Sequence, residues 1–139
     1  MNKRKIIIVV IILGLIGVFV AYKMYNKPHV NVFEKSADVI ITADKILEDF
    51  SSDENTANTK YLEKIIEIKG AISSIKIENE KGIISLQTND DFGSVLCHFS
   101  IESTKKIKEI QKGQDIVVKG ICTGYLMDVI LVKCEIINK

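Results

Sequence analysis

The chemically most versatile residues of this 139-residue sequence are three cysteines and two histidines. Cys97, Cys122 and Cys134 lack the C-x-x-C spacing that is typical of a structural zinc site. His98 and His29 lie in different segments, and neither has a serine or cysteine on the same face that could act as a nucleophile. We therefore expect neither a metal site nor a catalytic triad.

Carboxylates and glycines are the other residues that could do chemistry. Asp90 and Asp91 are adjacent in a segment of turn-forming residues, so they indicate a turn rather than a paired acid and base. Asp128 precedes an apolar run and is expected to fix a loop by hydrogen bonds. No helix follows Gly120 and Gly124, so they do not make a phosphate-binding loop. The sequence predicts no enzyme and no cofactor.

The segment 113–134 contains half of these residues. Two apolar runs, Ile116–Cys122 and Val129–Ile136, flank a short segment that contains Gly124 and Tyr125. This pattern predicts a β-hairpin. The residues expected to point inward are Ile116, Val118, Gly120, Cys122, Ile130, Val132, Cys134 and Ile136.

Three strands and a helix are expected before the hairpin. The strands are Ile65–Ile77, Ile83–Thr88 and Ser94–Ser100, and the helix is Ile101–Gln111, with Gly113 just beyond its end. Strands, helix and hairpin in the order β-β-β-α-β-β predict a five-stranded OB-fold barrel, so the fold class is all-β with helical additions.

Side-chain alternation adds detail to these elements. A change of parity after Gly70 predicts a β-bulge in the first strand. In the third strand Val95, Cys97 and Phe99 are expected to point inward and His98 outward. One face of the helix should carry Ile101, Ile107 and Ile110.

Two short helices are expected ahead of the barrel. Ala37–Ile41 is expected to be extended, and Thr42 is a good N-cap for a helix whose apolar residues are Ala43, Ile46, Leu47 and Phe50. Asp53 can cap a second helix, in which Ala57 and Tyr61 share a face. A helix of about two turns is unstable alone, so we expect both to cover an open end of the barrel.

An apolar run near the N-terminus follows the basic cluster Lys3-Arg4-Lys5. The run Ile6–Tyr22 has no charged residue and, as a helix, spans roughly 25 Å, close to the hydrocarbon thickness of a bilayer. The basic flank predicts that the N-terminus stays in the cytoplasm and the rest lies outside it.

A cleaved signal peptide is an alternative for this run. Phe19-Val20-Ala21 places a large residue where the cleavage site needs a small one, and a lipoprotein signal needs a cysteine earlier than Cys97. A buried soluble helix fits poorly because no face is polar. We therefore expect an uncleaved anchor at residues 1–25, a linker at 26–36, a helical cap at 37–61 and the barrel at 62–139.

The cysteines leave two alternatives open. All three have inward parity, where a cysteine acts as a small hydrophobic residue. Outside the cytoplasm, however, thiols oxidise, and the third and fifth strands of an OB barrel are neighbours. We favour unpaired core thiols, with a disulfide between Cys97 and Cys134 as the alternative.

Several short motifs in the soluble part recur in a known family. They are Asn55, Ala57 and Tyr61, Ile68-x-Gly70, Val95-x-Cys97-x-Phe99, Lys112-Gly113, Val118-x-Gly120-x-Cys122-x-Gly124, Asp128-Val129 and Leu131-x-x-Cys134. In this order they resemble the tRNA_anti-like family of bacterial OB-fold proteins, which are often signal- or membrane-anchored. The resemblance covers about Thr42 to Ile136 and implies kinship with anticodon-binding OB domains. It also implies structural roles for Tyr61, Gly70, Cys97, Gly120, Cys122, Gly124, Asp128 and Cys134.

Two functions of different classes remain. Single-strand nucleic-acid binding needs a basic groove and stacking aromatics. The net charge is +1, the outer faces of strands two and three offer Ser85, Gln87, Leu96 and His98, and Phe92 and Tyr125 lie in loops. We therefore expect a membrane-anchored module that binds an envelope protein, peptide or glycan. The alternative is a nucleic-acid-binding OB domain.

Overall fold

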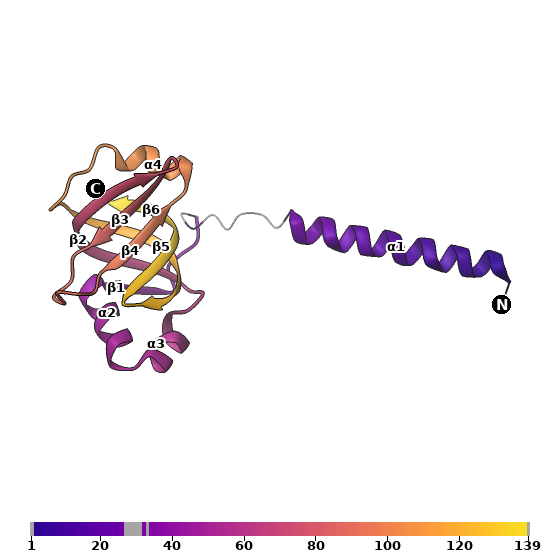
Figure 1. Cartoon of the computed structure of the whole chain (residues 1–139), viewed down its shortest axis with the longest axis horizontal. Helices are drawn as coiled ribbons and strands as arrows, with labels where there is room; N and C mark the ends of the chain where they lie inside the picture. The colour runs from indigo at the N-terminus through magenta and orange to yellow at the C-terminus, as the bar shows by residue number, and fades with distance from the viewer. Residues whose placement is uncertain (1, 27–31, 33, 139) are drawn as a thin grey trace. The chain divides into compact units, whose positions relative to one another are not determined.

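The structure is a computed structural model that describes residues 2–26, 32 and 34–138 (Figure 1). The chain divides into two compact units, Met1–Val30 and Asn31–Lys139. His29, one of the two histidines considered above, lies outside the described residues.

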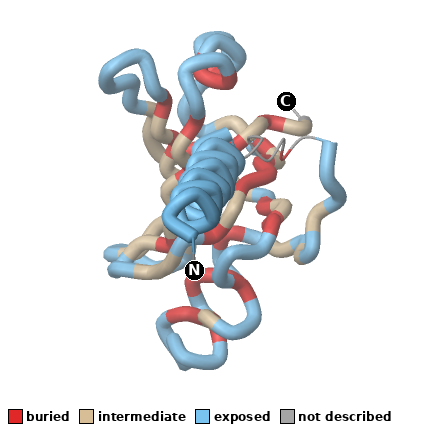
Figure 2. The backbone as a smooth tube through the Cα atoms, turned by 90° about the vertical axis from the view of Figure 1, so that its right-hand side faces the viewer, coloured by how far each residue is buried: buried red, intermediate tan, exposed pale blue. Residues whose placement is uncertain are grey.

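The described residues of the first unit form one helix, α1 (Lys3–Tyr25). Its mean hydropathy over the most apolar window is 2.8, and none of that window is buried. Figure 2 shows the helix exposed along its whole length. A helix satisfies its own backbone hydrogen bonds, as a membrane span must. The length and hydropathy suit a span, and a signal sequence has the same properties.

The second unit is a closed five-stranded barrel with additions. Its strands and one helix are β2 (Ile65–Glu78), β3 (Lys81–Leu86), β4 (Val95–Phe99), α4 (Ile101–Ile107), β5 (Asp115–Leu126) and β6 (Asp128–Asn138). The strand order is β2-β3-β4-β6-β5, and the pairing of β2 with β5 closes the barrel. Only β4 and β6 are parallel among these five strands. This is the predicted OB-fold arrangement, which is confirmed.

A sixth strand lies beside the barrel. β1 (Val39–Thr42) runs parallel to the first half of β2, from Val39 opposite Ile66 to Thr42 opposite Lys69. The second half of β2 pairs with β3 instead. β1 therefore covers backbone groups of β2 that would otherwise form an open sheet edge.

Two helices cover one end of the barrel, at the end away from α4 in Figure 1. They are α2 (Ala43–Ser52) and α3 (Glu54–Tyr61). The side chain of Thr42 accepts a hydrogen bond from Lys45 N at 3.3 Å, and that of Asp53 accepts one from Thr56 N at 3.2 Å, so both predicted N-caps are confirmed. The helices add to the barrel core the side chains of Ala43, Ile46, Leu47, Phe50, Ala57 and Tyr61.

The inward face of β6 was predicted wrongly in its first half. Val129 and Leu131 are buried, whereas Ile130 and Val132 lie on the outer side. Lys133 has a positive φ of 53°, and the register against β4 shifts there. This bulge inserts one residue, which returns Cys134 and Ile136 to the core as predicted.

The predicted bulge in β2 is confirmed, and it lies between Ile72 and Ser74, after Gly70. Gly70 has no positive φ. A Cβ atom there would lie 3.1 Å from Ala43 Cβ and 3.3 Å from Leu86 Cβ. The glycine is therefore explained by the close approach of α2 and β3, not by conformational freedom.

The turn of the last hairpin lies at the end of the segment that was predicted to connect the two apolar runs. Leu126 pairs with Asp128, so the turn is at Met127, whose φ is 67°. Gly124 lies inside β5 at a register shift, with φ of 149°.

Helix α4 is shorter than predicted, since it ends at Ile107, and Gly113 with φ of 88° lies in the turn before β5. Ile107 and Ile110 are buried, but Ile101 is 46% exposed. Thr104 takes the inward position instead, where its hydroxyl accepts a hydrogen bond from Gly82 N at 2.7 Å.

Candidate functional site

The outer side of β3, β4, β6 and the second half of β2 forms one continuous surface, which we call the outer sheet face. Strand pairing sets its residues in two rows. Ser85, Leu96 and Ile130 lie opposite one another in one row, and Ile83 lies opposite His98 in the next. The face comprises Ser74, Lys76, Ile83, Ser85, Leu96, His98, Ile130 and Val132.

This face is apolar rather than basic. Ile83, Leu96 and Ile130 are half-buried at its centre. Lys76 is the only residue of the face, as defined above, that carries a full positive charge. Such a surface offers dispersion contacts and apolar area, with little attraction for phosphate.

The loop aromatics do not form a stacking platform beside it. Phe92 is 84% exposed, as expected for a loop residue. Tyr125 instead stacks on Phe50, with ring centroids 5.4 Å apart and an interplanar angle of 20°. Tyr125 is thus part of the packing of α2 on the barrel. Of the two aromatic residues that were expected in loops, Phe92 alone is exposed.

The β3–β4 loop is fixed to the β5–β6 turn at the edge of this face. Ser94 N and Ser94 Oγ both donate to Asp128 Oδ1 at 2.8 Å, and Val129 N donates to Ser94 O at 3.0 Å. Within the loop, Phe92 N donates to Asp90 Oδ1 at 2.8 Å, as in an Asx-turn. The loop is therefore fixed by one carboxylate of its own, Asp90, and by Asp128 at the start of β6.

Two clefts lie on either side of the same loop. One, of about 630 Å³, lies between α2 and the loop and is lined by Asp44, Leu47, Glu48, Ser51 and residues 88–92. The other, of about 470 Å³, includes Ile72, Ser73, Gln87 and Lys112 in its lining. Phe92 borders both clefts.

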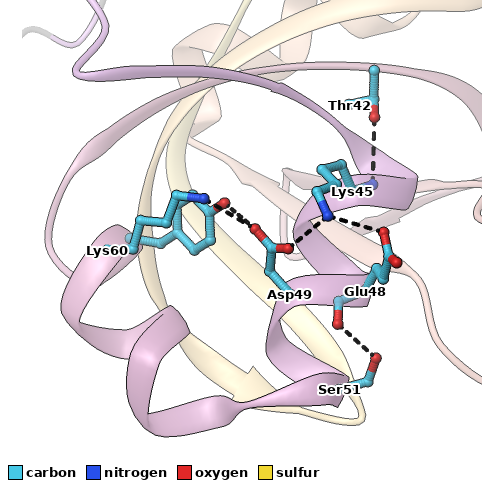
Figure 3. Close-up of polar contacts among 7 residues, drawn as sticks. Thr42, Lys45, Glu48, Asp49, Ser51 and Lys60 are labelled. Atoms are coloured by element: carbon cyan, nitrogen blue, oxygen red, sulfur yellow. Dashed lines mark hydrogen bonds and ion pairs between the residues drawn. The ribbon is translucent and has the colours of Figure 1, made fainter.

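The most elaborate polar network of the cap joins α2 to α3 and is structural. Asp49 Oδ2 accepts a hydrogen bond from the Tyr61 hydroxyl at 2.5 Å. Figure 3 shows Asp49 between Lys45 and Lys60, whose Nζ atoms lie 3.0 and 3.2 Å from its oxygens. The hydrogen bond from Tyr61 and the two lysines lower the pKa of Asp49 to about 2. Both carboxylate oxygens of Asp49 thus have partners within the cap, so Asp49 is a structural residue.

The three cysteines are unpaired and buried. A hydrogen bond links the thiols of Cys97 and Cys134, and burial raises the pKa of Cys134 well above its ordinary value. Gly120 leaves space for Cys134, because a Cβ there would lie 2.6 Å from its sulfur. Burial also raises the pKa of Cys122. These are the surroundings of unreactive thiols.

Among the described residues, His98 and the carboxylates of Asp90 and Asp91 do not converge on a reaction centre. His98 is half-buried on the outer sheet face, and Asp90 and Asp91 lie in the β3–β4 loop. Within the described part of the chain, no three metal-ligating side chains form a group that could hold a metal ion.

Sequence reasoning missed two contacts that cross between elements. Glu135 on β6 accepts a hydrogen bond from the Ser103 hydroxyl and lies 3.5 Å from Lys106 Nζ. Lys119 is buried on β5 and donates to Lys35 O at 2.9 Å. The contact of Glu135 could be anticipated only from the serine in the first turn of α4. No local sequence pattern indicates the contact of Lys119 with Lys35.

A family model for tRNA_anti-like proteins matches residues 1–136, which is almost the whole chain. The chain belongs to the tRNA_anti-like family. The resemblance found in the motifs is thereby confirmed, and the match includes the N-terminal helix. No curated protein sequence matches the chain.

One solved structure supports the same fold, and two others have lower similarity. A lipoprotein from Klebsiella pneumoniae, to which nucleic-acid binding has been attributed, has 14% identity and a TM-score of 0.61, and the match covers 70% of this chain and 91% of that one. A protein from Leishmania major assigned as an aspartyl-tRNA synthetase has 15% identity and a TM-score of 0.49, with 76% of this chain and 21% of that one covered. The Stn1–Ten1 complex of S. pombe has 18% identity and a TM-score of 0.43, with 54% and 59% covered. At 14% identity, the likeness to the Klebsiella lipoprotein shows the fold alone.

Proposed function

We propose that this tRNA_anti-like protein is a non-enzymatic binding module that is tethered to the cell membrane and recognises a protein, peptide or glycan partner in the envelope. In this proposal residues 1–25 are the anchor, 26–36 the linker, 37–61 the helical cap and 62–139 the barrel. The basic cluster Lys3-Arg4-Lys5 ahead of α1 supports a cytoplasmic N-terminus and an extracytoplasmic barrel.

The composition of the outer sheet face carries the proposal. OB folds bind their ligands mainly on this face and on the loops beside it. Here its centre is Ile83, Leu96 and Ile130, half-buried, with a single lysine in the set that defines the face. An apolar surface that is partly open to water gains free energy, about 25 cal/mol per Å² of apolar area, when a partner covers it.

Single-stranded nucleic acid is the second candidate partner. The Klebsiella lipoprotein, to which nucleic-acid binding has been attributed, supports it by likeness of fold. The distribution of charge opposes it, because the lysine cluster Lys105, Lys106 and Lys108 lies in and just after α4, apart from the outer sheet face. Lys106 is also paired with Glu135.

Site-specific photo-cross-linking in the native envelope tests this proposal. A photoreactive residue replaces Leu96 in the centre of the face or, as the control, Glu102, which is exposed in the first turn of α4. We expect protease-sensitive or glycan-containing adducts from position 96 and few from position 102. Nuclease-sensitive adducts from position 96, or equal yields at both positions, would contradict the proposal.

A further inference from the structure

The cleft between α2 and the β3–β4 loop, which we call the α2–loop cleft, has an unusual lining. Its volume is about 630 Å³. Four carboxylates line it, those of Asp44, Glu48, Asp90 and Asp91, and among the residues described no lysine or arginine does so. The cleft is thus a surface depression with concentrated negative charge in a protein whose formal net charge is +1.

Three of these four carboxylates make hydrogen bonds or ion pairs within the protein. Asp44 Oδ1 accepts a hydrogen bond from Asn89 N at 2.6 Å, and Asp90 Oδ1 accepts the one from Phe92 N. Glu48 Oε2 lies 3.1 Å from Lys45 Nζ. Asp91 makes no hydrogen bond or ion pair with any residue that the structure describes. The cleft therefore retains carboxylate oxygens that can receive a cation from outside.

Exposed apolar side chains lie next to the cleft. Phe92 is 84% exposed, and Leu126 and Met127 at the β5–β6 turn are 80% and 65% exposed. The loop and the turn are in contact, because a Cβ at Gly93 would lie 3.0 Å from Met127 O. Ser94 and Asp128 join the two segments as well, through the hydrogen bonds described above. Large exposed apolar side chains gathered beside a rim of charge are typical of interaction surfaces.

From this arrangement we propose that the α2–loop cleft binds a lysine or arginine side chain of a partner peptide segment, while an apolar neighbour in that segment packs on Phe92, Leu126 and Met127. The inference rests on the proposed function and specifies the chemistry of the partner. The apolar residues Leu96 and Ile130 lead from the outer sheet face towards the loop and the turn, so one extended segment can contact both surfaces.

Charge complementarity selects this occupant. Carboxylates repel phosphate, which disfavours nucleic acid and anionic lipid head groups at this cleft. A lysine or arginine carries its charge on a long apolar stem, so it suits a surface where carboxylates adjoin an aromatic ring. The ring of Phe92 can also receive a cation on its face.

Peptide titrations with the full chain in phosphatidylcholine nanodiscs test the inference. The probe is a fluorescein-labelled nonapeptide of alternating lysine and leucine, and its counterpart has glutamate in place of lysine. We expect the lysine peptide to bind at least about tenfold more tightly than the glutamate peptide, with affinity that falls as salt rises. Replacing leucine by serine in the lysine peptide should also weaken binding.

Matched charge reversals distinguish binding of the lysine peptide at the cleft from general electrostatic attraction between the peptide and the protein. Asp91→Lys should weaken binding of the lysine peptide about fivefold, whereas Glu80→Lys, in the exposed β2–β3 turn, should change it less than about twofold. Phe92→Ser should weaken binding without a change in charge. Equal losses for Asp91→Lys and Glu80→Lys, or equal affinities for the two peptides, would overturn the inference.

The experiments distinguish failure of the cleft inference from failure of the proposed role of the outer sheet face. If position 96 still yields protein adducts in an Asp91→Lys background with unchanged efficiency, the outer sheet face retains its proposed role and the cleft inference is overturned. If the lysine peptide binds at the cleft but position 96 yields no more adducts than position 102, the cleft inference holds and the role of the outer sheet face fails.

Discussion

The hydroxyl of Tyr61 donates a 2.5 Å hydrogen bond to Asp49, 12 residues earlier in the chain. Tyr61 is fully buried, and its ring lies 5.7 Å from that of Phe50. The hydroxyl of Tyr61 thus helps to connect α3 to α2, while its ring is part of the core. A tyrosine satisfies both requirements, since its body is apolar and its tip is polar.

The first prediction concerns the pH dependence of this contact. The folded protein lowers the pKa of Asp49 from 3.8 to about 2, so the unfolded chain takes up the proton first as the pH falls. The stabilisation is complete above about pH 4 and is lost between pH 4 and 2. Asp49→Asn should lower the free energy of unfolding by about 1–2 kcal/mol at pH 7 and by much less at pH 2.

Urea unfolding of the wild type and of Asp49→Asn at pH 7 and pH 2.5 checks this prediction. Tyr61→Phe is the matched control, because it removes the hydroxyl and keeps the ring. An equal difference in stability between wild type and Asp49→Asn at both pH values would show that the carboxylate charge contributes nothing.

The second prediction concerns Gly70. Its neighbours Ala43 and Leu86 leave little space for a side chain, so Gly70→Val should destabilise the barrel by about 1–3 kcal/mol. Gly70→Ala should cost less. The added substitution Ala43→Gly should recover part of the loss from Gly70→Val, since it removes the nearest atom. Thermal unfolding of the wild type and the three variants checks this, and a melting temperature unchanged by Gly70→Val would refute the packing argument.

The features that could be predicted from the sequence are those that depend on the residue pattern within one helix or strand. The barrel order, the caps at Thr42 and Asp53 and the burial of Phe50 follow from alternation, helical spacing and side-chain oxygens near the first helical turn. The bulge at Lys133 could not be predicted from the sequence. A bulge residue other than glycine does not differ in type from the ordinary residues of a strand.

The sites were harder to predict than the fold. The contact of Asp49 with Tyr61 and the stacking of Tyr125 on Phe50 both depend on how α2 packs against the rest of the chain. The α2–loop cleft likewise brings residue 44 beside residue 89, a proximity with no sign in the sequence. By contrast, alternation correctly placed Leu96 and His98 on the outer sheet face, because β4 is regular there.

The third prediction concerns the thiols. Because all three are buried, and burial raises the pKa of Cys122 and of Cys134, none should react readily with iodoacetamide at pH 8 in the folded protein. After unfolding without reductant, we expect three alkylated cysteines by mass spectrometry. A single alkylated residue at Cys122 would instead establish the Cys97–Cys134 disulfide.

The fourth prediction concerns topology. If α1 is an uncleaved anchor with a cytoplasmic N-terminus, protease added to intact spheroplasts should digest the barrel, and the undigested protein should stay with membranes in carbonate. A mature chain that begins near Lys23, or a barrel protected from protease, would contradict the anchor with this orientation.

The central claim is that the barrel recognises an envelope protein, peptide or glycan rather than nucleic acid. Fluorescence anisotropy with mixed single-stranded DNA and RNA, titrated with the full chain in phosphatidylcholine nanodiscs, tests it most directly. Because the set that defines the outer sheet face contains one lysine, we predict a Kd no tighter than about 10⁻⁴ M at physiological salt. Micromolar binding that weakens steeply with salt, and that Leu96→Asp abolishes while Glu102→Gln does not, would contradict it.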